Sequence, residues 1–222
     1  MPAVVDWGRR DYSESLEAMR ALVRARRARL APDTLILVEH PSVLTVGVEG
    51  DDGTAAASGL PVVAVERGGK ATYHGPGQLV GYPVVDLEAR GRDVRRFVRD
   101  VEEVVVRAVG SFGVRAEHVS GRPGVWVGGT RKIASIGIAV DHWVTFHGFA
   151  LNVDLDLSPF VRFRPCGFDG SVMTSLTREA GRPVRLDETR TPVVEAWNRV
   201  FGPEARAGSG RAPETSVSLP SA

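Results

Sequence analysis

The sequence predicts an α+β domain, with a mixed, largely antiparallel sheet and helices packed on it. Three observations predict this class: long helical patterns are few, short β-rich runs are many, and two of the runs are joined by a glycine turn typical of a hairpin. Residues 1–203 are expected to form a single domain, because the composition is that of a globular protein and no internal repeat is present. The tail 204–222 has too few apolar side chains to fold, and we expect it to be disordered.

Residues 11–30 predict the first helix, because Asp11 and Glu14 have the spacing of a capping box and apolar side chains recur on one face. Short runs rich in β-branched residues then predict three strands. They cover 34–40, 42–48 and the start of PVVAVERGG at Pro61. The next stretch, TYHGPGQLVG at 72–81, holds too many glycines for a regular element, and we interpret it as a pocket wall.

The next part of the chain contains a strand in YPVVDL and a helix that begins at Asp93 and is stopped by Gly110. GVWVGG and RKIASIGIAV predict a hairpin around the glycines at 128–129. The segment WVTFHGFALNVDLDL follows with apolar residues at period two, which is typical of a strand. RPVRLD predicts one more short strand, and the Thr-Pro pair at 191–192 begins a last helix.

Composition and charge exclude several classes of function. A net charge of +1, with no aromatic stripe among the basic residues, argues against nucleic-acid binding. The chain has no run of 18 apolar residues and no apolar stretch at its start, so we expect a cytoplasmic protein with no membrane partner. No cluster of His, Asp and Glu has the spacing of metal ligands, so we expect neither a metal nor a cofactor.

Lysine is rare in this chain. Of the 28 Lys plus Arg residues, only Lys70 and Lys132 are lysine, and both lie in glycine-rich segments. A lysine, unlike an arginine, can lose its proton when it is desolvated or placed beside another cation. The two positions therefore either require a lysine for their chemistry or have kept one by chance in an arginine-biased chain.

Cys166 is the one cysteine, which leaves it without an internal disulfide partner and fits a reducing compartment. A lone cysteine is usually a small buried hydrophobe. In RFRPCGFDG, however, the flanking proline and glycine and the nearby Arg162 and Arg164 indicate an electropositive loop that stabilises a thiolate. Such a thiolate can take an acyl group from a thioester and pass it to an amine without ATP. A neighbouring lysine would favour the thiolate and accept a proton, which makes Lys132 the candidate partner.

A second segment, RGGKATYHGPGQLVGYP, contains several candidate functional residues. Its glycines allow a ligand to approach the backbone closely, and Arg67, Tyr73 and His74 supply polar groups. The spacing matches neither common nucleotide-binding glycine loop. His74 is an alternative base for Cys166, as in cysteine hydrolases, although the sequence offers no partner to orient it. His147 is either a core or a strand-end histidine.

Four segments, RGGKATYHGPGQLVGYP, KIASIG, FHGFALNVDLDLSPF and RPCGF, together resemble the octanoyltransferase family of lipoate biosynthesis, also called lipoate-protein ligase B. The resemblance covers roughly residues 30 to 180 in the family's order and spacing. It implies the fold of biotin and lipoate protein ligases. It also implies transfer of an octanoyl group, without ATP, from octanoyl-acyl carrier protein to a lipoyl-domain lysine, the first step of endogenous lipoate synthesis. The acceptors implied are the lipoyl domains of 2-oxoacid dehydrogenase E2 subunits and the glycine cleavage H protein. The segment EHPSVLTVGVEG departs from the family at Leu44 and Val48, where relatives often carry an aromatic and a polar or basic residue.

By position, the resemblance implies that Cys166 is the acyl-thioester nucleophile and that Lys132 lowers its pKa. It also implies an acyl pocket made of Arg67, Gly68, Gly69, Lys70, Ala71, Thr72, Tyr73, His74, Ser135, Ile136, Gly137, Gly148, Phe149 and Ala150. Acyl carrier proteins and lipoyl domains are acidic, so a basic helix face has two interpretations: a steering surface for the carrier, or an ordinary solvated face. The residues of that face are Arg92, Arg95, Arg96 and Arg99.

Two other functions remain open at this point. An ATP-dependent lipoate or biotin ligase of the same fold is disfavoured, because such an enzyme needs no cysteine of this kind and the sequence holds no adenylate-type loop. A non-catalytic acyl-binding module would keep the pocket but would form no thioester.

Overall fold

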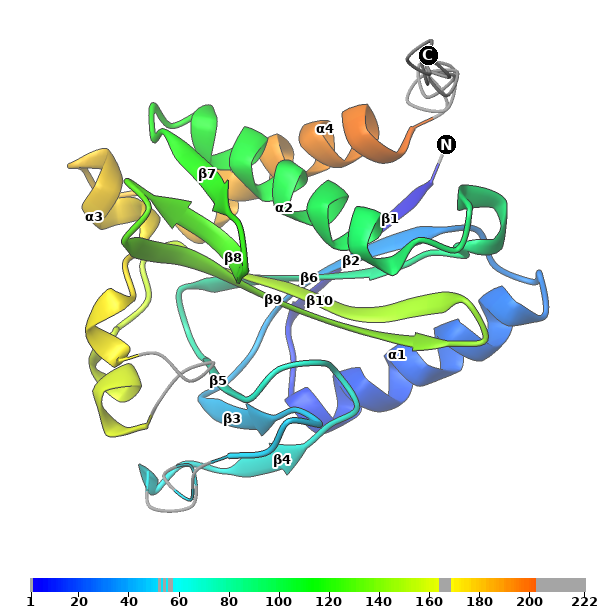
Figure 1. Ribbon diagram of the computed structural model, residues 1–222, viewed down its shortest axis with the longest axis horizontal. Coiled ribbons are helices and arrows are strands. Elements are labelled where there is room, and N and C mark those ends of the chain that lie inside the picture. The colour runs from blue at the N-terminus through cyan, green and yellow to red at the C-terminus, as the bar shows by residue number, and fades with distance from the viewer. Residues whose placement is uncertain (1, 52, 54, 56–57, 164–168, 203–222) are drawn as a thin grey trace, which may run out of the picture.

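The computed structural model describes residues 2–51, 53, 55, 58–163 and 169–202. Cys166 and the tail 204–222 lie outside this part of the chain. The described residues form two sheets with helices on both sides of the larger one (Figure 1).

A seven-stranded sheet forms the centre of the molecule, in the order β1-β2-β6-β10-β9-β8-β7. Strand β1 runs parallel to β2, and the other neighbouring pairs of this sheet are antiparallel. The predicted mixed, largely antiparallel sheet is therefore confirmed. The strands are β1 Ala3–Arg9, β2 Thr34–Glu39, β6 Gln78–Val84, β10 Val144–Asn152, β9 Arg131–Asp141, β8 Arg122–Val127 and β7 Ala116–Val119.

The two faces of this sheet carry different helices. Helices α2 (Val94–Gly110) and α4 (Arg190–Phe201) pack on one face, and α1 (Tyr12–Arg27) packs on the other (Figure 1). Alternation along β2 fits this arrangement, because Leu35 and Leu37 belong to the core under α2 and α4, whereas Ile36 and Val38 belong to the core under α1. The sheet is thus buried on both faces over its central strands.

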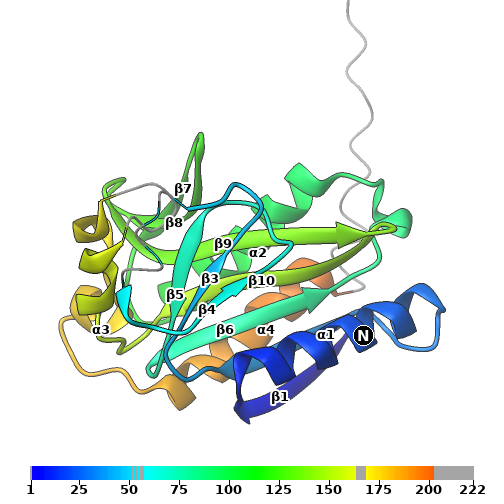
Figure 2. The same ribbon diagram turned by 90° about the horizontal axis from the view of Figure 1, so that it is seen from below.

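A three-stranded sheet lies on the α1 side of the large sheet (Figure 2). Its order is β4-β3-β5, with β4 at Val62–Ala64, β3 at Val43–Val46 and β5 at Ala71–His74. Alternate residues of β5 face different ways: Ala71 and Tyr73 pack into a third core cluster with Phe160 and Met173, and Thr72 and His74 face a cavity described below. This sheet therefore holds one wall of the cavity against the large sheet.

The segment 72–81 is regular, and our expectation of an irregular wall there was wrong. Strands β5 and β6 occupy most of it and are joined by a tight turn. Gly77 has φ +86°, and a Cβ there would lie 2.5 Å from the Asp154 carbonyl oxygen, so glycine is required at the turn. Gly81 lies inside β6, where a Cβ would be 2.2 Å from the Phe149 ring. These glycines allow close packing around regular strands.

The predicted helices are present with small changes at their ends. Asp11 caps α1 by accepting hydrogen bonds from the backbone of Ser13 and Glu14, and Asp93 caps α2. RPVRLD forms no strand, since its last residues enter the short helix η6 (Leu186–Thr189). The sequence analysis missed several short elements: β1, β7, α3 (Leu176–Ala180) and the 3-10 helices η2 (Glu88–Arg90), η3 (Ser158–Arg162) and η5 (Gly170–Val172).

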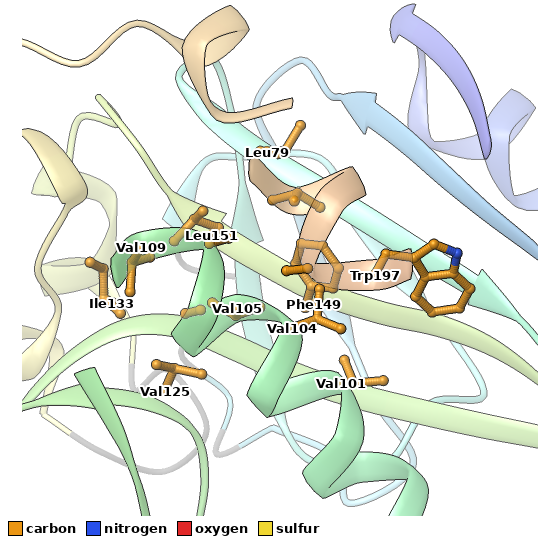
Figure 3. Close-up of a cluster of buried hydrophobic side chains, with 14 of the residues drawn as sticks. Leu79, Val101, Val104, Val105, Val109, Val125, Ile133, Phe149, Leu151 and Trp197 are labelled. Carbon is orange, nitrogen blue, oxygen red and sulfur yellow. The ribbon is translucent and has the colours of Figure 1, made fainter. Parts of the chain in front are cut away.

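The largest core cluster joins the sheet to α2 and α4 (Figure 3). Val101, Val104 and Val105 of α2 lie over Phe149 of β10. From α4, Trp197 stacks on Phe201 with ring centroids 4.1 Å apart and is 1% exposed. Large side chains buried to this extent contribute strongly to stability because their removal leaves a cavity.

Replacing Trp197 by alanine should lower the free energy of unfolding by about 3–5 kcal/mol, through lost burial and the cavity left behind. Urea unfolding followed by circular dichroism measures this change. A matched surface variant, Val4→Ala, should change it by no more than about 0.5 kcal/mol. A Trp197→Ala cost below about 1 kcal/mol would contradict the packing described for α4.

Candidate active site

A cavity lies between the large sheet, β5 and the N-terminal end of α1. The empty space between its side chains, together with the open solvent at its mouth, is about 370 Å³, of which the centre of a water molecule can occupy about 30 Å³. Its walls come from six parts of the chain: α1, the loop before β5, and strands β5, β6, β9 and β10. The lining residues are Tyr12, Arg67, Thr72, His74, Val80, Tyr82, Ser135, Ile136, Gly137, His147, Gly148, Phe149 and Ala150.

The pairing of β9 with β10 places small residues on the cavity wall. Gly137 is opposite Gly148, and Ser135 is opposite Ala150. A Cβ at Gly137 would lie 2.8 Å from Arg67 Cδ, and a Cβ at Gly148 would lie 2.0 Å from the Gly81 carbonyl oxygen. The glycines therefore let the Arg67 side chain and strand β6 approach these strands directly.

Arg67 is a buried cation in the cavity wall, only 6% exposed. Its Nη2 donates to the carbonyl and to the hydroxyl oxygen of Thr45 at 2.8 and 2.9 Å, and its Nη1 donates to the carbonyl of Gly68 at 3.1 Å. These bonds hold the guanidinium in one orientation. A fixed cation of this kind stabilises negative charge that develops nearby.

Two buried histidines beside the cavity are neutral. Burial lowers the pKa of His40 to about 4 and that of His74 to about 3. His40 contacts the Arg10 carbonyl through Nδ1 and the Tyr82 hydroxyl through Nε2, each at 2.8 Å. Burial also raises the pKa of Tyr12 to about 12, so this phenol is protonated at neutral pH. His40, His74 and Tyr12 therefore act as hydrogen-bonding groups without net charge.

His147 is at the other side of the cavity, in a strained conformation. It has φ +56°, unusual for a residue with a side chain, and is 1% exposed. Its Nε2 lies 3.5 Å from a carboxylate oxygen of Glu66, which also pairs with Arg20 of α1. Burial, with the nearby cation of Arg67, lowers the pKa of His147. Backbone strain at a site wall is often functional.

Most of the predicted pocket residues lie together around this cavity. Those that line it are Arg67, Thr72, His74, Ser135, Ile136, Gly137, Gly148, Phe149 and Ala150. Those that do not line it are Gly68, Gly69, Lys70, Ala71 and Tyr73. Gly68 and Gly69 instead fix the loop, because their backbone N–H groups donate to Ile138 O and to Glu49 Oε1, each at 3.0 Å. Lys70 is exposed.

Lys132 lies on β9 and is 2% exposed, unlike Lys70. Its ammonium is 5.5 Å from the centroid of the Trp126 ring, within range of a cation–π contact. The side chain passes over Gly124, where a Cβ would lie 2.6 Å from Lys132 Cε. The backbone N–H of Gly124 donates to the buried carboxylate of Glu102 at 2.9 Å. The lysine side chain is therefore packed into a defined position.

Cys166 lies outside the described residues, but the chain on both sides of it is described. Phe163 packs with Met173 in the third core cluster. Met173 forms a parallel bridge with Lys132, and the Thr174 N–H donates to the Lys132 carbonyl at 3.0 Å. The described chain after Cys166 thus returns to the backbone of Lys132.

Four lining residues were not among the predicted pocket residues: Tyr12, Val80, Tyr82 and His147. Of these, only Val80 lies in the segment 72–81 that we interpreted as a pocket wall. Val80 and Tyr82 follow the TYHGPGQ motif on β6, so strand alternation would have indicated them had β6 been predicted to start at Gln78. Tyr12 is distant in sequence and reaches the cavity only because α1 packs on the sheet. Ring stacking of Tyr12 on His74 fixes this contact.

Two features are absent from the part of the chain that the structure describes: a membrane-spanning helix and a cluster of metal ligands. None of the helices there is both long and apolar enough to cross a membrane. Within the same residues, no three or more His, Cys, Asp or Glu side chains come close enough to hold a metal ion.

Replacing His40 by asparagine should make the stability less sensitive to acid. In the folded protein His40 has a pKa of about 4, whereas in the unfolded chain it titrates near about 6.5. The unfolded chain therefore binds more protons between these values, and the free energy of unfolding falls as pH falls through this window. Between pH 7.5 and 5.0 this histidine accounts for a loss of about 2 kcal/mol.

Urea unfolding at the two pH values measures the effect. The drop from pH 7.5 to 5.0 should be smaller in His40→Asn than in the wild type by about 2 kcal/mol, whatever the stability of the variant at pH 7.5. An equal drop in both proteins would contradict a buried neutral His40.

Known proteins resemble this chain in sequence. A family model, the lipoyl protein ligase A/B catalytic domain, matches residues 11–198. The octanoyltransferase of Geobacter sulfurreducens is 46% identical over 191 residues, which cover 86% of this chain and 81% of that protein. The octanoyltransferase of Mycobacterium bovis is 46% identical over 188 residues, which cover 84% of this chain and 81% of that protein.

Solved structures resemble it in fold. A crystal structure of lipoate-protein ligase A bound with ATP has a TM-score of 0.75 at 18% identity, covering 90% of this chain and 85% of that one. The apo structure of biotin protein ligase from Aquifex aeolicus has a TM-score of 0.55 at 9% identity, covering 90% and 69%. These likenesses confirm the predicted fold type. The sequence matches go further: the chain belongs to the lipoyl protein ligase A/B catalytic-domain family and, within it, to the octanoyltransferases.

Proposed function

We propose that this protein transfers an octanoyl group from octanoyl-acyl carrier protein to a lipoyl-domain lysine through a thioester on Cys166. The acceptors are the lipoyl domains of 2-oxoacid dehydrogenase E2 subunits and the glycine cleavage H protein. Relatives named octanoyltransferase, at 46% identity over most of both chains, support the reaction class. The roles of Cys166 and Lys132 are part of the proposal.

One observation carries the proposal furthest: a buried lysine lies on the strand that forms the cavity wall. Lys132 and the lining residues Ser135 to Gly137 share β9, and about 10 Å of strand separates Lys132 from Ser135. That spacing is comparable with an extended octanoyl chain. An acyl chain held between the small residues of β9 and β10 therefore has its reactive end within reach of Lys132.

In the first half-reaction the Cys166 thiolate attacks the carbonyl carbon of the octanoyl thioester. A new carbon–sulfur bond forms, and the carrier thiolate leaves. Lys132, present as the ammonium, gives its proton to that leaving thiolate and becomes a neutral amine. The exchange of one thioester for another is close to isoenergetic, so no ATP is needed.

In the second half-reaction the neutral amine of the acceptor lysine attacks the Cys166 thioester. The amide bond forms, the Cys166 thiolate leaves, and the surplus proton on nitrogen passes to Lys132. This step restores the thiolate and the ammonium with which the cycle began. Lysine serves both steps because it can carry and release a proton, which arginine cannot do at accessible pH.

The structure gives little support to the basic helix face around α2, defined above by its four arginines, as a steering surface for the acyl carrier protein. Helix α2 packs on the sheet face opposite α1, whereas the cavity lies on the α1 side. Two of its arginines already have acidic neighbours, since Arg92 pairs with Glu88 and Arg96 lies 4.0 Å from Asp100. This placement favours an ordinary solvated face over a docking surface.

The thioester is tested by intact mass. Incubation with octanoyl-acyl carrier protein, without ATP, should add the mass of one octanoyl group, and hydroxylamine should remove it. The adduct should be absent in Cys166→Ser. An adduct or product that forms only when ATP is supplied would favour a ligase, and tight octanoate binding without any adduct would favour an acyl-binding module.

Replacing Lys132 by arginine keeps a positive charge but removes proton transfer. The rate of octanoyl transfer should fall by about 10²–10⁴-fold. Transfer to an isolated lipoyl domain, measured as octanoylated product by mass spectrometry, gives the rate, and circular dichroism checks that the variant is folded. A near-normal rate would remove Lys132 from the mechanism.

A further inference from the structure

A chain of buried hydrogen bonds connects the cavity wall to the backbone of Lys132. His74 Nδ1 lies 2.8 Å from Gln78 Oε1, and Gln78 Nε2 lies 3.0 Å from Asn152 Oδ1. Asn152 Nδ2 lies 2.9 Å from the Thr174 carbonyl oxygen, and the Thr174 N–H donates to the Lys132 carbonyl. Gln78 and Asn152 are each 1% exposed, so water does not compete with these bonds.

Backbone carbonyls fix the direction of every bond in this chain. The Thr174 carbonyl only accepts, so the amide nitrogen of Asn152 faces it and the amide oxygen faces Gln78. Gln78 Nε2 also donates to the Tyr73 carbonyl at 3.1 Å, which turns its oxygen toward His74. His74 must therefore carry its proton on Nδ1.

Donor and acceptor directions are also fixed at the Arg67 end of this hydrogen-bond network. Arg67 Nη2 donates to Thr45 Oγ1, so the Thr45 hydroxyl proton is available for His74 Nε2, 3.4 Å away. Both ring nitrogens of His74 are then engaged within the protein. This arrangement assigns His74 to the network and removes the reason to make it the base for Cys166, the alternative that its sequence position left open.

The far end of the chain is a clamp on the segment that follows Cys166. The Thr174 hydroxyl donates to Glu179 at 2.7 Å, and Glu179 accepts two hydrogen bonds from Arg131, at 2.8 and 2.9 Å. Residues 173 and 174 thereby pair directly with the backbone of Lys132, and Thr174 is connected to Arg131 through Glu179. Asn152, on β10, is the side chain that connects this clamp to the cavity.

We propose that Gln78 and Asn152 are positioning residues for octanoyl transfer. They keep His74 in its Nδ1–H form at the cavity wall, and they hold the chain at Met173 and Thr174 against Lys132. The inference rests on the proposed function, since it gives Lys132 and the loop before Met173 their catalytic meaning. Neither Gln78 nor Asn152 lines the cavity.

Asn152→Ala removes both side-chain bonds and should lower kcat by about ten- to a hundredfold while the KM for octanoyl-acyl carrier protein stays within about threefold. The matched control is Thr145→Val, on the same strand. Thr145 is fully buried and bonds Pro83 O and Val85 N, but it does not line the cavity. Both variants should lose stability, and only Asn152→Ala should lose kcat.

Asn152→Asp distinguishes a loss of kcat caused by lost positioning from one caused by lower stability of the fold. The carboxylate can accept from Gln78 but cannot donate to the Thr174 carbonyl, whereas the protonated acid does both. Burial raises the pKa of such an aspartate, so the acid form is regained as pH falls. Well below the unfolding temperature, the ratio of its kcat to that of the wild type should therefore rise from pH 8 to pH 6. The Asn152→Ala ratio should stay flat.

A flat ratio for Asn152→Asp, or equal kcat losses in Asn152→Ala and Thr145→Val, would overturn the inference. If Asn152→Ala does not fold, Asn152→Asp provides its own comparison at the two pH values. Failure of the proposed function looks different: Cys166→Ser would then transfer octanoyl normally. An inactive Cys166→Ser together with a normal Asn152→Ala would overturn only the positioning role.

Discussion

The register between β9 and β10 is the constraint on which the rest of the site depends. It sets Gly137 opposite Gly148 and Ser135 opposite Ala150, so these four positions of the cavity wall carry only small side chains or none. The space gained is used by Arg67, whose Cδ lies 2.8 Å from the position that a Cβ of Gly137 would take. A shift of one residue would turn these positions to the α2 face and fill the cavity with larger residues. The same strand carries Lys132, so one register fixes both the wall and the lysine.

Polarity around the cavity comes mainly from oriented dipoles. Burial keeps His40 and His74 neutral and the phenol of Tyr12 protonated, while the network from Arg67 to Lys132 orders donors and acceptors in a single direction. Fixed dipoles need no reorganisation when charge develops, which suits the thioester exchange that we propose. Asn152 connects this wall to the chain at Thr174. The cavity and the surroundings of Lys132 are therefore parts of one buried structure.

The fold class was predictable from local patterns, whereas most of the cavity-lining residues were implied by the resemblance to the octanoyltransferase family. Helix α2 follows a regular apolar face and an Asp93 cap, and the β8–β9 hairpin follows its glycines. The prediction of an irregular wall at 72–81 was wrong because Gly81 is needed inside a regular strand, where it packs against the Phe149 ring. This contact joins strands that are far apart in sequence. Tyr12 could not be predicted for the same reason. Gly124, which makes room for Lys132, likewise gave no signal in the sequence, because its function depends on the neighbouring strand.

The central claim is that Lys132 and Cys166 act as a coupled pair. Alkylation of Cys166 by iodoacetamide, followed by mass spectrometry across pH, measures the ionisation of the thiol directly. In the wild type, we expect the alkylation rate of Cys166 to reach half its maximum at a pH below about 8.5, the pKa of a free cysteine. In Lys132→Met, this midpoint should lie at least about one pH unit higher. Identical midpoints in the two proteins would contradict a coupled pair.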